Sequence, residues 1–245
     1  MIDPYGRTID YLRLSITDRC NYRCQYCMPP AAPTQGGSLP PEDYVQICAA
    51  AVKLGVKKIR ITGGEPLLHP EILPICQAVA SIPGLQELCL TTNGKLLPAL
   101  AKPLKEAGVS RLNISLDTLR PDRFTQITRL GRLEDVLSGI RAAERAGFDH
   151  LKLNAVLMGG INDDEIGDFL ALTREHPWQV RFIELMPMGP CGNWPKERFL
   201  PVTEVLVRFP ELEPLPPEGV ARQYRLPGAM GTVGLIAPLS HSFCS

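Results

Sequence analysis

The chain has 245 residues, and its 26 Lys and Arg balance 26 Asp and Glu, so the formal net charge is zero. This balance argues against a surface built to bind a polyanion such as nucleic acid. The apolar runs are shorter than the roughly 18 residues of a membrane span, and the first residues carry no basic and apolar leader. We therefore expect a cytoplasmic protein of one to two domains, with no membrane and no nucleic acid as partner.

Alternating apolar residues, rich in Ile, Leu and Val, predict six β-strands: 11–17, 57–62, 87–92, 111–117, 151–158 and 179–186. Between most of them, apolar residues at helical spacing predict helices near 41–52, 70–79, 97–107, 133–146 and 163–175. After these, a Pro-rich stretch at 210–217 is interpreted as a surface connection, and 222–237 as a hairpin or an extended segment.

Three segments share one design, in which a helix ends, a glycine follows, and a strand begins a few residues later. The glycines are Gly55, Gly108 and Gly147, and glycine suits the left-handed position just past a helix end. Repeated strand–helix units predict a parallel sheet. Because units of one design tend to wind in one direction, we favour an incomplete barrel over a doubly wound sheet.

Most predicted strands have one apolar and one polar face. Ile59 and Ile61, for example, alternate with Lys58 and Arg60. If the apolar faces pack against the helices, the polar faces point into the barrel and bring four cations inside: Arg13, Lys58, Arg60 and Lys152. Buried cations without partners are costly, so we interpret the interior as a solvated lumen that holds an anionic ligand. The alternative is a sheet with one solvent face.

A loop directly after the first predicted strand carries Cys20, Cys24 and Cys27 at C-x₃-C-x₂-C spacing. A structural zinc site is closed by four protein ligands, and a [4Fe–4S] cluster is usually held by four Cys. If three thiolates hold such a cluster, one iron keeps an open position for a small molecule. The alternatives are unligated thiols, or zinc with a distant fourth ligand. We expect the other cysteines to fill the core or to be incidental: Cys48, Cys76, Cys89 and Cys191.

This loop resembles the cluster motif of radical S-adenosylmethionine (SAM) enzymes, and Gly63-Gly64-Glu65-Pro66 after the second strand resembles their SAM-binding segment. From about Tyr5 to Cys244 the chain is similar to the GTP 3′,8-cyclase family, molybdenum cofactor biosynthesis protein A. The segments that carry this likeness are DYLRLSITDRCNYRCQYCMPP, KKIRITGGEPLL, LTTNG, LNISLDTL and RFIELM. The resemblance implies an incomplete (β/α)6 TIM-like barrel of parallel strands over 1–209, with 210–245 as the start of a C-terminal region that is cut short.

The resemblance also implies a lyase that performs the first step of molybdenum cofactor (molybdopterin) biosynthesis. A 5′-deoxyadenosyl radical made from SAM would abstract the ribose 3′ hydrogen of GTP, and bond formation between C3′ and C8 would give 3′,8-cyclo-GTP. The implied cofactors are a [4Fe–4S] cluster and SAM, with a second cluster in the intact family protein. A reductant protein would be the electron donor, and whether the chain forms a homodimer stays open.

Carried over by motif, three sets of residues are implied. The first cluster would be held by Cys20, Cys24 and Cys27; SAM would be bound by Tyr26, Gly64, Ser115 and Met186; and GTP would be bound by Arg13, Arg60, Thr91 and Lys152. Cys244 stands at the first ligand position of the second cluster, but its two further cysteines, an Arg pair for GTP and a Gly-Gly tail do not follow. On this resemblance we expect the chain as given to cleave SAM slowly without making the cyclic product.

Two alternatives stay open. A radical SAM enzyme that acts on another small molecule or on a peptide would keep the cysteine loop, but it would not need Arg13, Arg60 and Lys152 together. A non-catalytic module that binds zinc through the three thiols would need neither Gly63–Pro66 nor Ser115.

Overall fold

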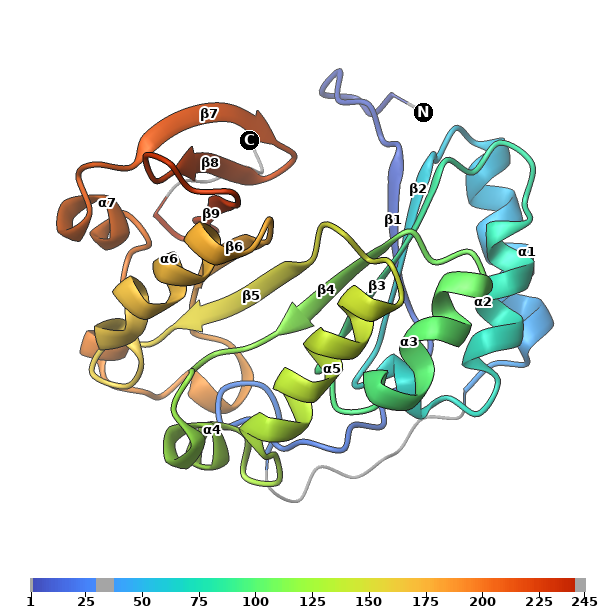
Figure 1. The fold of residues 1–245 in the computed structure, drawn as a ribbon. Helices are drawn as coiled ribbons and strands as arrows, with labels where there is room; N and C mark the ends of the chain where they lie inside the picture. The colour runs from blue at the N-terminus through green and yellow to red at the C-terminus, as the bar shows by residue number, and fades with distance from the viewer. Residues whose placement is uncertain (1, 30–37, 241–245) are drawn as a thin grey trace. The chain divides into compact units, whose positions relative to one another are not determined.

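The computed structural model describes residues 2–29 and 38–240 (Figure 1). It forms two compact units, each built from three separate stretches of the chain. Unit 1 comprises Met1–Asn21, Pro33–Asn113 and Asp135–Phe148. Unit 2 comprises Tyr22–Ala32, Ile114–Glu134 and Asp149–Ser245.

Unit 1 is built from alternating strands and helices. Its strands pair in parallel in the order β1 (Tyr11–Ser15), β2 (Lys58–Thr62) and β3 (Glu87–Thr92). In Figure 1 three helices accompany these strands: α1 (Pro41–Lys53), α2 (Ile72–Ala80) and α3 (Leu97–Glu106). Two elements belong to both units, since β4 (Arg111–Ser115) begins in unit 1 and α5 (Leu133–Arg145) begins in unit 2.

The apolar strand faces of unit 1 form its core. Ile59, Ile61 and Leu90 are completely buried, and α2, which packs against β3, contributes Ile75 and Val79. Each such side chain stabilises the fold by about 1.5–3 kcal/mol relative to an exposed one. Three cysteines predicted to be core are also completely buried: Cys48, Cys76 and Cys89. Burial raises the pKa of Cys48 to about 11 and that of Cys76 to about 12, as expected for thiols that only pack.

Unit 2 continues the parallel pattern and adds a hairpin. Its strand order is β5 (Lys152–Leu157), β6 (Gln179–Glu184), β9 (Thr232–Ile236), β8 (Ala221–Arg225) and β7 (Glu213–Glu218). The first two pairs are parallel and the last two antiparallel. The helices are α4 (Pro121–Thr128), α6 (Ile166–Glu175) and α7 (Glu204–Arg208). Phe169 of α6 meets Phe182 of β6 edge to face, with ring centres 6.0 Å apart.

All six predicted strands and the hairpin after 222 are confirmed, and three local features differ. The short helix α7 was not predicted. Helix α4 was not predicted, although Pro121 at its first position is a typical helix start. The surface connection expected at 210–217 is wrong, because most of it forms β7. Proline cannot donate to a strand ladder, and β7 tolerates its prolines because it lies at the edge of the sheet and its pairing is irregular between Leu215 and Glu218.

Replacing Gly139 by alanine is expected to destabilise the protein by about 3 kcal/mol. A Cβ atom at this position of α5 would lie 2.1 Å from the carbonyl oxygen of Gly94. Elsewhere in a helix, alanine stabilises by about 0.5–1 kcal/mol relative to glycine, so the sign of the change is diagnostic. Urea unfolding measures it. The control is Gly167→Ala in α6, where the new Cβ would only touch the ring of Phe209 at 3.3 Å. A Gly139→Ala variant as stable as the parent would contradict the close approach of α5 to Gly94.

Candidate functional site

The glycine-rich segment after β2 binds the loop that follows β1. The amide of Gly64 donates to the carbonyl of Thr17 at 2.7 Å, and that of Glu65 donates to the carbonyl of Arg19, also at 2.7 Å. A Cβ atom on Gly64 would lie 2.4 Å from the oxygen of Arg19. Glycine is therefore required here by the close approach of two backbones, and this approach places the residues just before Cys20.

The carboxylate of Glu65 joins this segment to the loop after β3. It is 1% exposed, and it accepts hydrogen bonds from the hydroxyl of Thr92 at 2.7 Å and from the amides of Asn93 at 2.7 Å and Leu67 at 3.1 Å. Asn93 in turn donates through its side chain to Asn21, beside Cys20, at 2.6 Å. Burial raises the pKa of Glu65, and the three hydrogen bonds offset this only in part. One buried acid thus organises three loops of unit 1.

Replacing Glu65 by glutamine is expected to destabilise the protein by about 2 kcal/mol. The amide nitrogen that replaces one carboxylate oxygen cannot accept, so at least one buried donor loses its partner. Urea unfolding of the variant is compared with that of Glu71→Gln, which changes an exposed side chain and should leave stability within about 0.5 kcal/mol of the parent. Equal stability of the two variants would show that Glu65 does not hold these loops together.

Three residues predicted to bind GTP come together in unit 1. Arg13 and Arg60 are opposite each other in the β1–β2 register, and Arg60 approaches the hydroxyl of Thr91 at 3.5 Å. Arg60 is 6% exposed and also donates to the hydroxyl of Tyr11 at 2.6 Å. Within residues 2–29 and 38–240, neither arginine has a carboxylate partner. Of the two, only Arg60 is buried, and a buried cation in this state favours an anionic ligand.

Lys58, another of the four cations predicted to face inward without a partner, is already neutralised. The Glu87 carboxylate pairs with Lys58 and, at 2.6 Å, with Arg111. Burial tends to raise the pKa of Glu87, but the two cations outweigh it and lower the pKa. The expectation of four unpaired inward cations is thus wrong for Lys58. Arg13, which was expected to be buried, is exposed.

In unit 2, Tyr26 of the cysteine loop is held by a buried acid that the sequence analysis did not assign. Its hydroxyl donates to Asp117 at 2.8 Å, and the amide of Val156 donates to the other oxygen of Asp117 at 2.9 Å. Burial raises the pKa of Asp117 to about 6. Asp117 lies two residues after Ser115 and so on the same face of the predicted strand. This shared face is the feature of the sequence from which its place in the site could have been predicted.

The remaining predicted residues of unit 2 lie near strand ends. Lys152 begins β5 and is 6% exposed, Ser115 ends β4 half-buried, and Met186 follows β6 and is 36% exposed. The thiol of Cys191, expected to be incidental, is buried and donates to the carbonyls of Met186 at 3.1 Å and Met188 at 3.2 Å. It therefore fixes the segment after Met186.

The chemistry of the thiols fits an iron–sulfur cluster. None of the cysteines that the structure describes forms a disulfide, and those of the loop differ from the rest in exposure: Cys20 and Cys24 are half-buried and Cys27 is exposed. Cys20 belongs to unit 1, and Cys24 and Cys27 belong to unit 2. In the described part of the chain, no three His, Cys, Asp or Glu side chains are grouped so that they could hold a metal ion. The assignment of Cys20, Cys24 and Cys27 as cluster ligands therefore rests on their spacing in the sequence and on their exposure. Cys244 lies outside the described residues.

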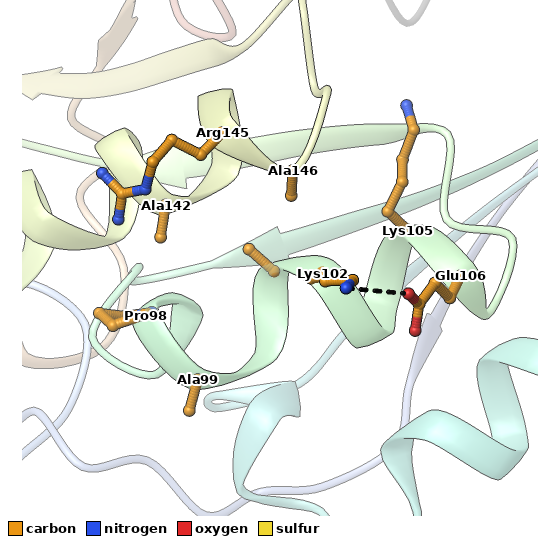
Figure 2. A pocket seen from close by; sticks show the side chains of 9 residues that line it. Pro98, Ala99, Lys102, Lys105, Glu106, Ala142, Arg145 and Ala146 are labelled. Atoms are coloured by element: carbon orange, nitrogen blue, oxygen red, sulfur yellow. Dashed lines mark ion pairs between the residues drawn. The ribbon is translucent and has the colours of Figure 1, made fainter.

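A pocket of about 440 Å³ lies elsewhere, between α3 and α5 of unit 1 (Figure 2). Small side chains such as Ala99 and Ala142 line it together with Lys105 and Arg145, and Lys102 pairs with Glu106 at 3.9 Å. None of the predicted ligand residues lines this pocket, so we do not assign the chemistry to it.

Comparison with known proteins agrees with these features. The sequence model described as Radical SAM superfamily matches residues 14–173, and Molybdenum Cofactor Synthesis C matches 178–245. Among solved structures, methylornithine synthase shares 15% identity at a TM-score of 0.65, covering 77% of this chain and 57% of that one. SuiB of Streptococcus suis bound to S-adenosylmethionine shares 20% identity at a TM-score of 0.57, and the match covers 71% of this chain and 40% of that one. The fold is thus the incomplete (β/α)6 TIM-like barrel of radical SAM enzymes, and the doubly wound sheet is excluded.

Curated relatives narrow the family. GTP 3′,8-cyclase of Alkaliphilus oremlandii is 49% identical over 249 residues, which cover all of this chain and 78% of that protein. The enzyme of the same name from Geobacter sulfurreducens is 50% identical over 253 residues, covering all of this chain and 77% of that protein. The chain belongs to the radical SAM superfamily and, within it, to the GTP 3′,8-cyclase family. A [4Fe–4S] cluster and SAM are accordingly its cofactors. Among the described residues, no helix has the length and apolar character needed to cross a membrane.

Proposed function

We propose that this protein is a GTP 3′,8-cyclase that performs the first step of molybdenum cofactor biosynthesis. It would abstract the ribose 3′ hydrogen of GTP and join C3′ to C8, which gives 3′,8-cyclo-GTP. The observation that carries the substrate is the pair of Arg13 and Arg60 on one strand face, without a carboxylate partner in the described chain. A nucleoside triphosphate supplies the anionic charge that such a pair calls for.

The residue assignments follow the motifs. In the proposal, Cys20, Cys24 and Cys27 hold the cluster; SAM is bound by Tyr26, Gly64, Ser115 and Met186; and GTP is bound by Arg13, Arg60, Thr91 and Lys152. When bound, the cluster and SAM supply the one-electron chemistry that produces the hydrogen-abstracting 5′-deoxyadenosyl radical.

The chain's own side chains orient these groups. Arg60 is oriented by the Tyr11 hydroxyl, so its guanidinium is aligned before a phosphate arrives. Glu65 and Asn93 hold Asn21 beside Cys20, and Asp117 holds Tyr26 between Cys24 and Cys27. The role of this framework is positioning, since a misplacement of about 1 Å can lower a rate by about a hundredfold.

Four wider assignments belong to the same proposal. A reductant protein donates the electron, and the cytoplasm is the compartment. Residues 1–209 form the barrel and 210–245 a C-terminal region, in which Cys244 stands at the position of a ligand to the family's second cluster. A homodimer is the oligomeric state to be tested, by light scattering.

The test uses the protein expressed from its complete natural reading frame and reconstituted anaerobically with iron and sulfide. It is given SAM, dithionite and GTP deuterated at the ribose 3′ position. We expect transfer of deuterium to 5′-deoxyadenosine, together with a cyclic product identified by mass spectrometry. SAM cleavage without deuterium transfer would favour a radical SAM enzyme for another substrate. Bound zinc, with no iron chromophore, would favour the metal-binding module.

A further inference from the structure

The carboxyl end of α4 binds the part of the cysteine loop that contains Cys24. Backbone amides of the loop donate to the last carbonyls of the helix, from Arg23 to Thr128 at 3.0 Å and from Gln25 to Ile127 at 2.9 Å. The side chain of Gln25 adds a bond to the carbonyl of Gln126 at 2.6 Å. The last carbonyls of a helix have no partner within it, so the loop satisfies groups that would otherwise be left to water.

Aromatic packing fastens the start of the same loop. Tyr22 meets Phe124 of α4 edge to face, with ring centres 5.9 Å apart and planes at 83°. Gly131 lies so close that a Cβ atom there would be 2.9 Å from the Tyr22 ring. These contacts between the loop and α4 involve no metal.

Arg129, the residue after α4, completes this arrangement in an unusual conformation. Its φ is 62°, and among the described residues it is the non-glycine residue with positive φ. Its guanidinium donates to the carbonyls of Arg23 at 2.9 Å and Met28 at 3.1 Å. These two carbonyls flank the segment that contains Cys24 and Cys27.

The backbone of Arg129 alone does not call for arginine. Glycine adopts positive φ without a steric penalty and commonly ends helices, whereas a side chain is strained there. Strained residues persist where the surrounding contacts over-determine them. Here the contacts are the two loop carbonyls that the guanidinium bridges.

We propose that Arg129 is a positioning residue that holds the Arg23–Met28 segment in the shape in which Cys24 and Cys27 bind the cluster. It acts through the backbone carbonyls of Arg23 and Met28. The metal part of this inference rests on the proposed function. The docking of the loop does not, and it can be measured on the full chain before reconstitution.

The test compares Arg129→Gly with Arg129→Ala. Both lose the guanidinium, but only glycine relieves the backbone. In the chain before reconstitution, we expect iodoacetamide to alkylate Cys24 about tenfold faster in both variants, with the half-buried Cys20 as internal reference. The midpoint of thermal unfolding should be kept or raised in Arg129→Gly and lowered in Arg129→Ala. The matched control is Arg132→Ala, which removes an exposed cation close by that lies 3.7 Å from Glu134.

After reconstitution, both variants should release iron to a chelator about tenfold faster than the parent and show an altered electron paramagnetic resonance spectrum of the reduced cluster. Both bonds come from the same nitrogen, Nη1, so Arg129→Lys, which keeps the charge and several donors on one nitrogen but changes the length of the side chain, should fall between parent and Arg129→Ala. Cys24 alkylation at the parent rate in Arg129→Gly would overturn the proposal, as would faster alkylation in glycine but not in alanine. If neither the parent nor any variant binds iron while alkylation responds as expected, the proposed function fails and the docking role stands.

Discussion

Replacing Cys24 by alanine is expected to abolish both the iron chromophore and SAM cleavage. Cys24 is the middle thiol of the three, and Cys20 and Cys27 would be left as two ligands for a cluster that usually takes four. The measurements are iron and sulfide content after anaerobic reconstitution, the visible spectrum, and the yield of 5′-deoxyadenosine. Activity should fall to the background of the assay without enzyme.

The control for this variant is Cys48→Ala. Cys48 is a buried thiol of α1 with no exposed surface, so its removal tests whether the loss of any cysteine lowers iron binding. We expect Cys48→Ala to keep iron and cleavage. Retained iron and retained cleavage in Cys24→Ala would exclude Cys24 as a cluster ligand.

Replacing Arg60 by alanine should weaken the binding of GTP by about ten- to a hundredfold, the loss expected for a charge-assisted contact of about 1.5–3 kcal/mol. The binding of GMP should change much less, because a single phosphate leaves fewer anionic oxygens within reach of the guanidinium. Equilibrium binding of both nucleotides to the reconstituted protein measures the difference, and SAM cleavage without GTP should change little.

The control for Arg60 is Lys102→Ala, which removes one positive charge from an exposed position of α3, outside the predicted ligand set. Its affinity for GTP should match that of the parent. Equal losses for GTP and GMP in Arg60→Ala would mean that Arg60 does not contact the phosphate chain. A loss in Lys102→Ala would mean that net charge alone sets the affinity.

Local pattern predicted the parallel sheet and the cysteine loop, and the family resemblance added the chemistry. Strand periodicity, glycines after helices and the three cysteines are all features of neighbouring residues, and each depends on a repeat or a spacing within a few positions. The predicted strands β1 to β6 therefore agree with the structure to within two residues at either end. The strand parity that brought Arg13, Arg60 and Thr91 to one face is confirmed by the register of β1 with β2 and by the approach of Arg60 to Thr91.

What the sequence alone determined is thus the fold class, the family and the cysteine loop. Only the tertiary structure decided which partners these residues take: Glu87 for Lys58, Asp117 for Tyr26, Asn93 for Asn21, and Arg129 for the loop carbonyls. These pairs join positions far apart in the chain, such as Arg129 and Arg23, which are 106 residues apart. Periodicity reports which face of an element a residue occupies. It cannot report which distant polar group will meet it there, because that depends on how the loops at the strand ends pack in three dimensions.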